Sequence, residues 1–545
     1  MAQRAPQSET RLLASLATVT SILSFLAFQG RDQILLSGDA VAHMGIARRV
    51  VDSLTPGPTQ LGTVWLPLQH ILSLPFVASD PLWQSGVGGS IPSMVGYVLA
   101  VTGVFRLVRS VLRETSLSSH ATSSAWFAAL VLLANPNLIY VQATALNESL
   151  YLAEFVWAVV FLADFARFVR QGDDDAAADA LRHCAMVLAA AILTRYDGWV
   201  LTILCGLTML AVLGKRPGWA ELARRQHTVL RRAVVAFVLL GALTPALWMA
   251  YNFGLFQDPL EFARGPYSAK AILQRSSQPG VPMYPGYHDL RVAGIFYLKC
   301  AKLNLAAGRW GPWLLLLALA GTAVAIALRR WIWVLLWLPL PFYAFSIAYE
   351  AVPIFLPVWW PHSYYNTRYG LQLLPAVAVF VAVAMAFALA RTEGRRWQFI
   401  APLAFSAVLV GSYLSAWGKT PISLREAIGN SRTRVAYEKT LAQALEDLPP
   451  NGRLLMYIGD HVDALRRAGV PLRRVVNESN YPLWQQALDA PSRHADYVIA
   501  MDGGPVAQAV ARHPQDLESL LVISSTGQPR TTIYKSRVAG VPGAR

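Results

Sequence analysis

Residues 183–213 read HCAMVLAAAILTRYDGWVLTILCGLTMLAVL, and this stretch decides the topology of the chain. A helix needs about 20 apolar residues to cross a ~30 Å hydrocarbon core, so the stretch is too long for one ordinary span. Polar residues interrupt it between Arg195 and Gly198, and basic residues follow from Lys215 onward. Because basic loops remain in the cytoplasm, two spans that meet at Arg195–Gly198 place this loop with the other basic loops of the chain. We therefore predict a helical hairpin that breaks there.

The composition indicates a membrane protein. Of 545 residues, 54% are hydrophobic and 14% are charged, whereas a soluble domain carries about 25% charged residues. This excludes a wholly soluble chain, a disordered chain and a coiled coil. The net charge of +15 would also suit nucleic-acid binding, but the basic residues lie in short loops between apolar segments, so we expect no nucleic-acid partner. Three cysteines provide no disulfide framework and no Cys-based zinc site.

Eleven segments are candidate membrane spans. They are 11–29, 86–107, 122–140, 147–168, 183–194, 197–213, 231–251, 311–328, 331–348, 370–390 and 397–416. The first follows a short polar start without an Ala-x-Ala cleavage pattern, so we expect it to be retained. Basic loops begin at Arg106, Arg167, Lys215, Arg329 and Arg391. These loops should be cytoplasmic, so the N-terminus is expected inside and the C-terminus outside.

The segments between the spans suggest three functional loops and one further domain. The long outer loops are 30–85, 252–310 and 349–369, and loops of such length usually carry function. Residues 64–78 are apolar but short and rich in proline, which favours an interfacial or re-entrant helix. From residue 417 onward, short strands alternate with helices. The strands are predicted at 454–457, 474–476, 497–500 and 520–523, and the helices at 460–468 and 506–512.

The predicted fold class is therefore an α-helical polytopic membrane protein with a small C-terminal α/β domain outside the membrane. The transmembrane domain is predicted at 1–416 and the α/β domain, with a partly parallel sheet, at 417–545. We expect the protein in the plasma (inner) membrane of the cell envelope.

Asp39 is the first candidate for chemistry. It opens a predicted amphipathic helix in the first outer loop, and His43 follows one turn later on the same side. A carboxylate at the boundary between water and lipid can accept a proton. The alternative is that Asp39 only caps the N-terminus of its helix.

Two further carboxylates begin or enter spans. Glu148 lies in the first turn of a span, where it is favourable with the helix dipole. Glu154 lies deeper, where a carboxylate needs a partner or a cavity, in a structural or a catalytic role. At the break of the hairpin, Arg195 either pairs with Asp197 or binds an anionic ligand such as phosphate, whose oxygens match the guanidinium donors.

Basic residues of the other outer loops are also candidates for anion binding. Arg264 and Lys270 lie in a loop with several Gly and Pro residues, as in a mobile substrate loop, or they are merely solvated. Arg368 and Tyr369 enter the span at 370–390. An arginine there either binds a ligand or extends to lipid headgroups.

Taken in order, these segments resemble the integral-membrane glycosyltransferases of the GT-C superfamily, which take sugars from polyprenyl-phosphate donors. The resemblance covers about residues 10–415. It rests on Gly38-Asp39 at the head of a helix, Trp65-Leu66-Pro67-Leu68 before the second span, Glu148, Thr194-Arg-Tyr-Asp-Gly-Trp199, and Arg368-Tyr369 before the span with Leu373-Leu-Pro375.

The resemblance implies roles for these residues. A carboxylate of the first outer loop is the catalytic base in that superfamily, which carries over to Asp39. The cations expected to hold the donor phosphate are Arg195, Arg264 and Arg368. The side chains expected to bind substrate are His43, Trp65, Glu148, Asp197 and Tyr369.

The chain also departs from each branch of the superfamily. The protein mannosyltransferase branch has an Asp-Glu pair where Asp39 is followed here by Ala40. The lipid A aminoarabinose transferase branch has a lysine beside its prolines, where this chain has Trp65 and Leu66. The oligosaccharyltransferase branch uses a divalent metal and a Trp-Trp-Asp motif. Trp359-Trp-Pro361 lacks that Asp, so we expect no metal and no cofactor.

The predicted activity is transfer of a sugar from a polyprenyl-phosphate donor to a glycan, lipid or protein acceptor at the outer face of the membrane, among membrane lipids. The phosphate of such a donor leaves as a stable anion, so the enzyme must deprotonate the acceptor and stabilise the phosphate. The alternative is a transporter or lipid flippase, which would predict inverted repeats and matched broken helices that the sequence does not contain. A non-catalytic scaffold for the C-terminal domain is a third interpretation.

Overall fold

The structure is a computed structural model that describes residues 4–215, 228–276, 280, 282–396, 398–459 and 461–538. Several predicted ranges lie partly outside these residues. They are the two domains at 1–416 and 417–545, the loop at 252–310, the basic loop after Lys215, the span at 397–416 and the helix at 460–468.

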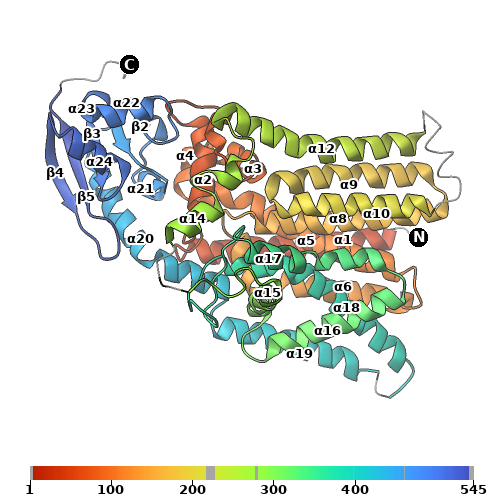
Figure 1. Cartoon of the computed structure of the whole chain (residues 1–545). Coiled ribbons are helices and arrows are strands. Elements are labelled where there is room, and N and C mark those ends of the chain that lie inside the picture. Colours follow the sequence, from red (N-terminus) through yellow and green to blue (C-terminus); the bar gives the residue numbers. More distant parts are fainter. Residues whose placement is uncertain are drawn as a thin grey trace.

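Long helices lie side by side in one bundle, and a small sheet lies beyond one end of it (Figure 1). The helices of the bundle are α1 (Arg4–Gln29), α5 (Val87–Leu112), α6 (Ala121–Leu133), α7 (Pro136–Gln142), α8 (Glu148–Gln171), α9 (Asp174–Thr194), α10 (Asp197–Gly214), α12 (Val229–Phe256), α15 (Leu290–Leu305), α16 (Trp310–Ala327), η3 (Trp331–Trp337), α17 (Pro339–Ala348), α18 (Leu374–Thr392) and α19 (Ile400–Gly418). The break in the hairpin is confirmed, because α9 ends at Thr194 and α10 begins at Asp197.

The number of apolar spans is smaller than predicted. In the described residues, nine helices are long and apolar enough to cross a membrane, and α6 with α7, bent by 62°, makes a tenth. The prediction of eleven also counted α8, which has 24 residues but is more highly charged. α8 buries its three carboxylates against its neighbours. Asp164 contacts Arg106 at 2.7 Å, and Glu154 accepts a hydrogen bond from Thr194 at 2.9 Å.

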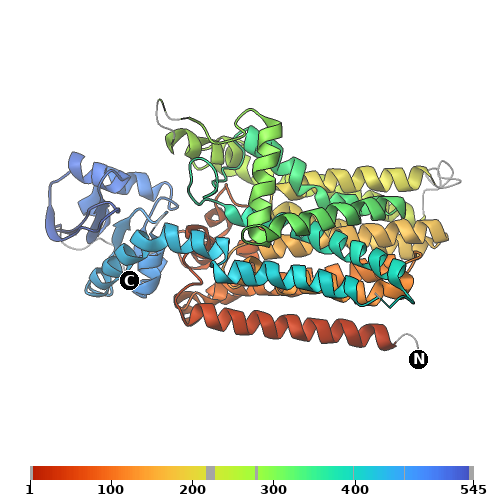
Figure 2. The ribbon, with the colours of Figure 1, turned by 90° about the horizontal axis from the view of Figure 1, so that it is seen from below.

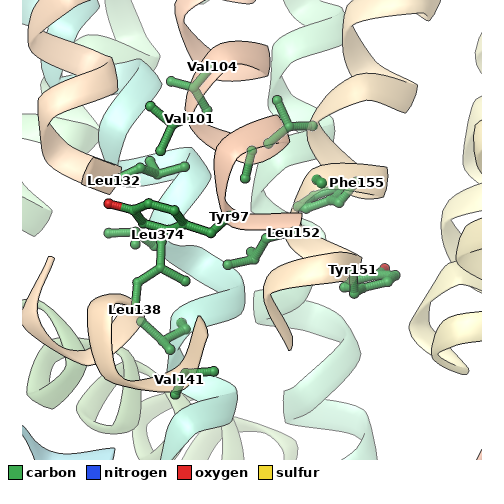
Figure 3. Packing of buried hydrophobic residues seen from close by; sticks show 14 of the residues in the cluster. Tyr97, Val101, Val104, Leu132, Leu138, Val141, Tyr151, Leu152, Phe155 and Leu374 are labelled. Atoms are coloured by element: carbon green, nitrogen blue, oxygen red, sulfur yellow. The ribbon is translucent and has the colours of Figure 1, made fainter. Parts of the chain in front are cut away.

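The core of the bundle is packed around aromatic and branched side chains of α5, α6, α8 and α18. Figure 3 shows Tyr97 of α5 among Leu132, Leu152 and Leu374, all buried. The hydroxyl of Tyr97 donates a hydrogen bond to the carbonyl of Leu133 at 2.7 Å, which satisfies its polar end inside the bundle. The four helices therefore form a fixed frame beneath the outer loops.

Several short elements lie at the end of the bundle nearest the sheet (Figure 1). These are α2 (Gly38–Val51), η1 (Pro58–Leu61), α3 (Leu68–Val77), α4 (Asp80–Gln84), α13 (Glu261–Arg264), α14 (Ala269–Ser276) and η4 (Thr367–Leu373). The segment predicted as an interfacial or re-entrant helix contains α3, which has only ten residues. Its N-cap is Pro67 and it contains Pro75. Because ten residues do not span the hydrocarbon core, this helix is too short to cross a membrane.

A long helix, α20 (Ile422–Glu446), leads from the bundle into the C-terminal domain (Figure 2). The remaining elements there are β1 (Leu454–Met456), α21 (Val462–Arg467), η5 (Leu472–Arg474), β2 (Val475–Val476), α22 (Leu483–Asp489), α23 (Pro491–His494), β3 (Tyr497–Met501), α24 (Pro505–Arg512), β4 (Leu517–Ile523) and β5 (Thr531–Ser536). The strand order is β2-β1-β3-β5-β4. β1 pairs in parallel with β2 and β3, and β5 pairs antiparallel with β3 and β4, so the partly parallel sheet is confirmed. β5 was not predicted from the sequence.

The end of the bundle away from the sheet contains several arginine–carboxylate pairs. The start of α1 and the sheet lie at opposite ends (Figures 1 and 2). Near the start of α1, Glu9 pairs with Arg109 at 2.6 Å. Arg330 pairs with Glu114 at 3.0 Å, and Arg167 lies 3.6 Å from the same carboxylate. Basic loops that lie apart in the sequence thus contribute arginines that share acidic partners in the structure.

Candidate active site

Arg368 is the centre of the candidate site, and three carboxylates surround its guanidinium. η4, a short 3₁₀ helix that precedes α18, places this side chain in the protein, where it is 8% exposed. Its Nε donates to Glu148 at 2.8 Å, and its Nη1 lies 3.4 Å from Glu426. Its Nη2 pairs with Asp39. An arginine fork that binds three carboxylates from distant parts of the sequence fixes all of them relative to one another.

Asp39 is the most accessible of these carboxylates. Its side chain is 33% exposed, against 2% for Glu148 and 9% for Glu426. In the part of the chain that the structure describes, this carboxylate accepts no hydrogen bond from the backbone at the start of α2, and the side chain of Ser37 at the N-cap position accepts none either. The cap alternative therefore has no geometric support, and Asp39 instead faces Arg368.

Arg195 forms a second polar centre beside the first. Its Nε lies 3.2 Å from Asp197, its Nη1 donates to Asn147 at 3.2 Å, and its Nη2 donates to the hydroxyl of Tyr343 at 2.7 Å. Arg195 also lies 3.6 Å from Glu148, which therefore bridges both guanidiniums. The pairing of Arg195 with Asp197 is confirmed, while a second edge of the guanidinium is directed at Tyr343.

Tyr369 lies between the two arginines. The guanidinium carbon of Arg195 is 4.5 Å from the centre of its ring, and that of Arg368 is 5.2 Å from it. Cations over an aromatic face are attracted by the ring quadrupole. The ring therefore helps to keep two like charges close together, and the predicted site residues Arg195, Arg368 and Tyr369 form one cluster.

His43 and Trp65 lie on the α2 and α3 side of this cluster. The ring of His43 is 5.0 Å from the ring of Trp65, and its Nδ1 is 2.8 Å from Nε2 of His70. Burial, with the nearby charges of Arg368 and Arg195, lowers the pKa of His43 to about 3. Burial also lowers the pKa of His70. Both imidazoles are therefore neutral at physiological pH, so neither adds a cation to the site.

Two predicted cations lie apart from the cluster. Arg264 is 66% exposed at the end of α13, and its nearest carboxylate is Asp258 at 3.9 Å. Lys270 of α14 lies 3.7 Å from Glu350 and is 60% exposed. The structure places neither side chain in contact with Arg195 or Arg368.

Glu426 was not foreseen from the sequence, because it lies ten residues beyond the boundary predicted for the membrane domain. Its backbone neighbours carry no motif, and no signal in the single sequence links it to Arg368. Tyr343 and Asn147 were also missed, since an aromatic residue and an amide at the edges of spans are common. Together with the predicted residues they complete the polar shell of the two arginines.

The cluster carries more negative than positive charge. It contains four carboxylates, from Asp39, Glu148, Asp197 and Glu426, and two guanidiniums. One oxygen of Glu148, Oε2, is buried without a hydrogen-bond partner in the described residues. Across the described residues, no group of three or more His, Cys, Asp or Glu side chains is arranged to hold a metal ion.

An apolar cavity of about 650 Å³ shares two helices with the site. Its lining includes Leu204 of α10, Leu319 of α16 and Pro341 of α17, and Thr208 and Thr322 are its only polar residues. α10 begins with Asp197 of the site, and α17 also carries Tyr343. The cavity thus shares α10 and α17 with Asp197 and Tyr343, two members of the polar shell of Arg195.

A polytopic helical bundle with a charged cluster at one end and a small mixed sheet beyond it is the fold of two solved structures of a membrane protein, ArnT. The crystal structure of ArnT from Cupriavidus metallidurans bound to undecaprenyl phosphate matches 98% of this chain and 99% of its own, with a TM-score of 0.54 and 14% identity. The apo structure of the same protein matches 99% of both chains, with a TM-score of 0.56 and 13% identity.

A third solved structure is more distant. An oligosaccharyltransferase from Archaeoglobus fulgidus, in complex with Zn and sulfate, matches 95% of this chain and 72% of its own, with a TM-score of 0.48 and 12% identity. No protein-family model and no curated protein sequence matches this chain.

Proposed function

We propose that this protein is a glycosyltransferase that takes a sugar from a polyprenyl-phosphate donor and transfers it to an acceptor glycan, lipid or protein at the outer face of the membrane. The observation that carries the proposal is the pairing of the accessible Asp39 with the buried Arg368 at the outer end of a GT-C bundle. A general base and a phosphate-binding cation are the two groups that the reaction needs.

Donor binding would replace a carboxylate on Arg368 by the phosphate of the donor. The cluster already carries two more carboxylates than guanidiniums, so a phosphate binds well only if a carboxylate moves away. Asp39 is the most exposed carboxylate on Arg368, whereas Glu148 and Glu426 are held by buried contacts. The donor phosphate replaces Asp39 at Nη2 of Arg368, and the released carboxylate then faces the acceptor as a general base. Arg195 supports the phosphate through its position beside Tyr369.

We also assign roles in substrate binding to His43, Trp65 and the apolar cavity. His43, one turn after Asp39 on α2, and Trp65, which packs against it, contribute to acceptor binding. The apolar cavity lined by Leu340 and Pro341 of α17 accommodates part of the donor's prenyl tail. Phosphate departure is stabilised by the arginine forks, so the reaction proceeds without a metal ion. ArnT was crystallised with undecaprenyl phosphate, which makes this lipid the first donor product to test.

We expect undecaprenyl phosphate to bind to the purified full-length chain and to raise its melting temperature in detergent or nanodiscs. A ligand present at 100 times its Kd stabilises the folded state by about 2.7 kcal/mol. Undecaprenol, which has the same tail without the phosphate, is the control and should give a much smaller shift. An equal effect of both lipids would show that the tail alone is recognised, and would contradict a phosphate site at the arginines.

The proposed orientation places the site and the C-terminal domain outside the cytoplasm. A periplasmic reporter such as alkaline phosphatase, fused after Arg545, is expected to be active, because the arginine-rich end of the bundle stays inside. A cytoplasmic reporter at the same position is the matched control and should be inactive. The reverse pattern would place the sheet in the cytoplasm.

A further inference from the structure

Helix α20 runs from the bundle to the sheet domain (Figure 2). On the way it contacts the segments that carry both halves of the candidate active site. Its first contact is made by Glu426, whose Oε1 accepts from the backbone N–H of Asn366 at 2.8 Å. Its Oε2 accepts from the backbone N–H and the hydroxyl of Thr367, at 2.7 and 2.6 Å. Both oxygens therefore hold the start of η4, the element that carries Arg368.

The second contact is made two turns later by Arg434. Its Nη2 donates to the carbonyls of Leu36 at 2.9 Å and Leu35 at 3.3 Å. Its Nη1 donates to Glu438 at 2.7 Å, and this carboxylate is fully buried. Leu36 lies three residues before Asp39, so the Arg434 fork holds the segment that leads into α2.

The other end of α20 is fastened to the sheet domain. The hydroxyls of Tyr437 and Thr531 of β5 lie 2.6 Å apart, within hydrogen-bond distance. The ring of Tyr437 also packs edge-on against His461, with 5.0 Å between the ring centres. Three consecutive regions of one helix therefore contact Arg368's segment, Asp39's segment and the sheet.

We propose that the C-terminal domain positions the active site through α20, with Glu426 as the positioning residue for Arg368 and Arg434 as the positioning residue for Asp39. The assignment of Arg368 as the phosphate-binding cation and of Asp39 as the general base rests on the proposed function, whereas the contacts of Glu426 and Arg434 do not. A rigid helix keeps its side chains at fixed spacing, so α20 sets the separation between the base and the phosphate-binding cation. This gives the extracytoplasmic domain a role within the reaction site.

The Glu426 half is tested by binding of undecaprenyl phosphate to the full-length chain. In Glu426→Gln, one accepting oxygen becomes an NH₂ that faces a backbone N–H, so the start of η4 is held less firmly. We expect the affinity to fall about tenfold, as for other partners that orient a ligand-binding side chain. Glu446→Gln, at an exposed position near the end of the same helix, is the matched control and should bind normally.

A double variant shows whether Glu426 acts through Arg368. Arg368→Lys should weaken binding on its own, and adding Glu426→Gln should then change the affinity by no more than about twofold. The proposal is overturned if Glu426→Gln binds normally, or if its tenfold loss persists in the Arg368→Lys background. If Arg368→Lys binds as tightly as the unmodified chain, the proposed function is wrong instead, and only the next measurement decides the positioning role.

The Arg434 half is tested by hydrogen exchange, which needs no ligand. Arg434→Lys keeps the charge beside Glu438 but loses the fork that reaches two carbonyls. We expect the backbone amides of residues 35–41 to exchange several-fold faster, with β3 and β5 unchanged. Arg432→Lys, exposed on the same helix, is the control. Unchanged exchange at 35–41 would overturn the role of Arg434, and faster exchange throughout the sheet would reduce it to general stabilisation.

Discussion

Asp39→Asn is expected to lower the rate of sugar transfer by about 10²–10⁴-fold, the usual contribution of a positioned general base. The substitution keeps the size of the side chain and one accepting oxygen, but asparagine cannot take a proton at neutral pH. It also removes the carboxylate that competes for Nη2 of Arg368, so binding of undecaprenyl phosphate should be unchanged or tighter. Transfer is measured as release of undecaprenyl phosphate from donor in membranes that contain the chain.

This substitution separates the two interpretations of Asp39. Asparagine caps a helix about as well as aspartate, so a capping residue would tolerate the change. Near-normal transfer with normal folding would therefore mean that another group is the base. Asp52→Asn is not a suitable control, because Asp52 is buried against Arg48. Asp173→Asn, at the N-cap of α9 and distant in sequence from the site, tests the tolerance of a helix cap directly.

Arg368→Ala should abolish donor binding and transfer together, because the guanidinium would contact the phosphate in both the ground state and the transition state. It also leaves Glu426 buried without its cation and Glu148 with Arg195 alone, and removing one partner of a buried pair costs about 3–5 kcal/mol of folding free energy. Binding of undecaprenyl phosphate and the free energy of unfolding should therefore both fall.

Arg368→Lys distinguishes loss of function from loss of folding. Lysine keeps a positive charge near the carboxylates but lacks the planar fork that reaches three of them. We expect a folded protein that binds undecaprenyl phosphate at least about tenfold more weakly. Arg512→Lys, exposed on α24, is the matched control. Normal donor binding in both Arg368 variants would leave this arginine only a structural role.

The spans and the break of the hairpin could be predicted because both depend on local composition. A bilayer requires long apolar helices, and the basic loops decide which side each connection lies on. The prediction also counted α8, which is not among the helices of the described residues that are apolar enough to cross a membrane by length and composition. Its charges are satisfied by Arg106 and Thr194, partners that lie far away in the sequence.

The candidate site could be predicted only in part. Asp39, Glu148, Arg195 and Arg368 stood out because charged residues at the edges of spans are uncommon. Glu426 did not, since it lies in an ordinary polar helix and its importance comes from tertiary contacts with η4. The separation of Arg264 from the cluster could not be predicted from the sequence either, because tertiary packing and not composition decides where a loop lies relative to a site. The functional roles of all these residues stay predictions.

The two-residue connection between α9 and α10 ties the active site to the thickness of the bilayer. α9 has 21 residues, which at 1.5 Å per residue is about 31 Å, close to the thickness of the hydrocarbon core. Arg195 follows directly after the last residue of this candidate span. One residue more or less in α9 would move it by about 1.5 Å and turn it by about 100°. A thinner or thicker membrane would offer the donor phosphate at a different height, so host lipid composition becomes a determinant of how well the arginines meet their substrate.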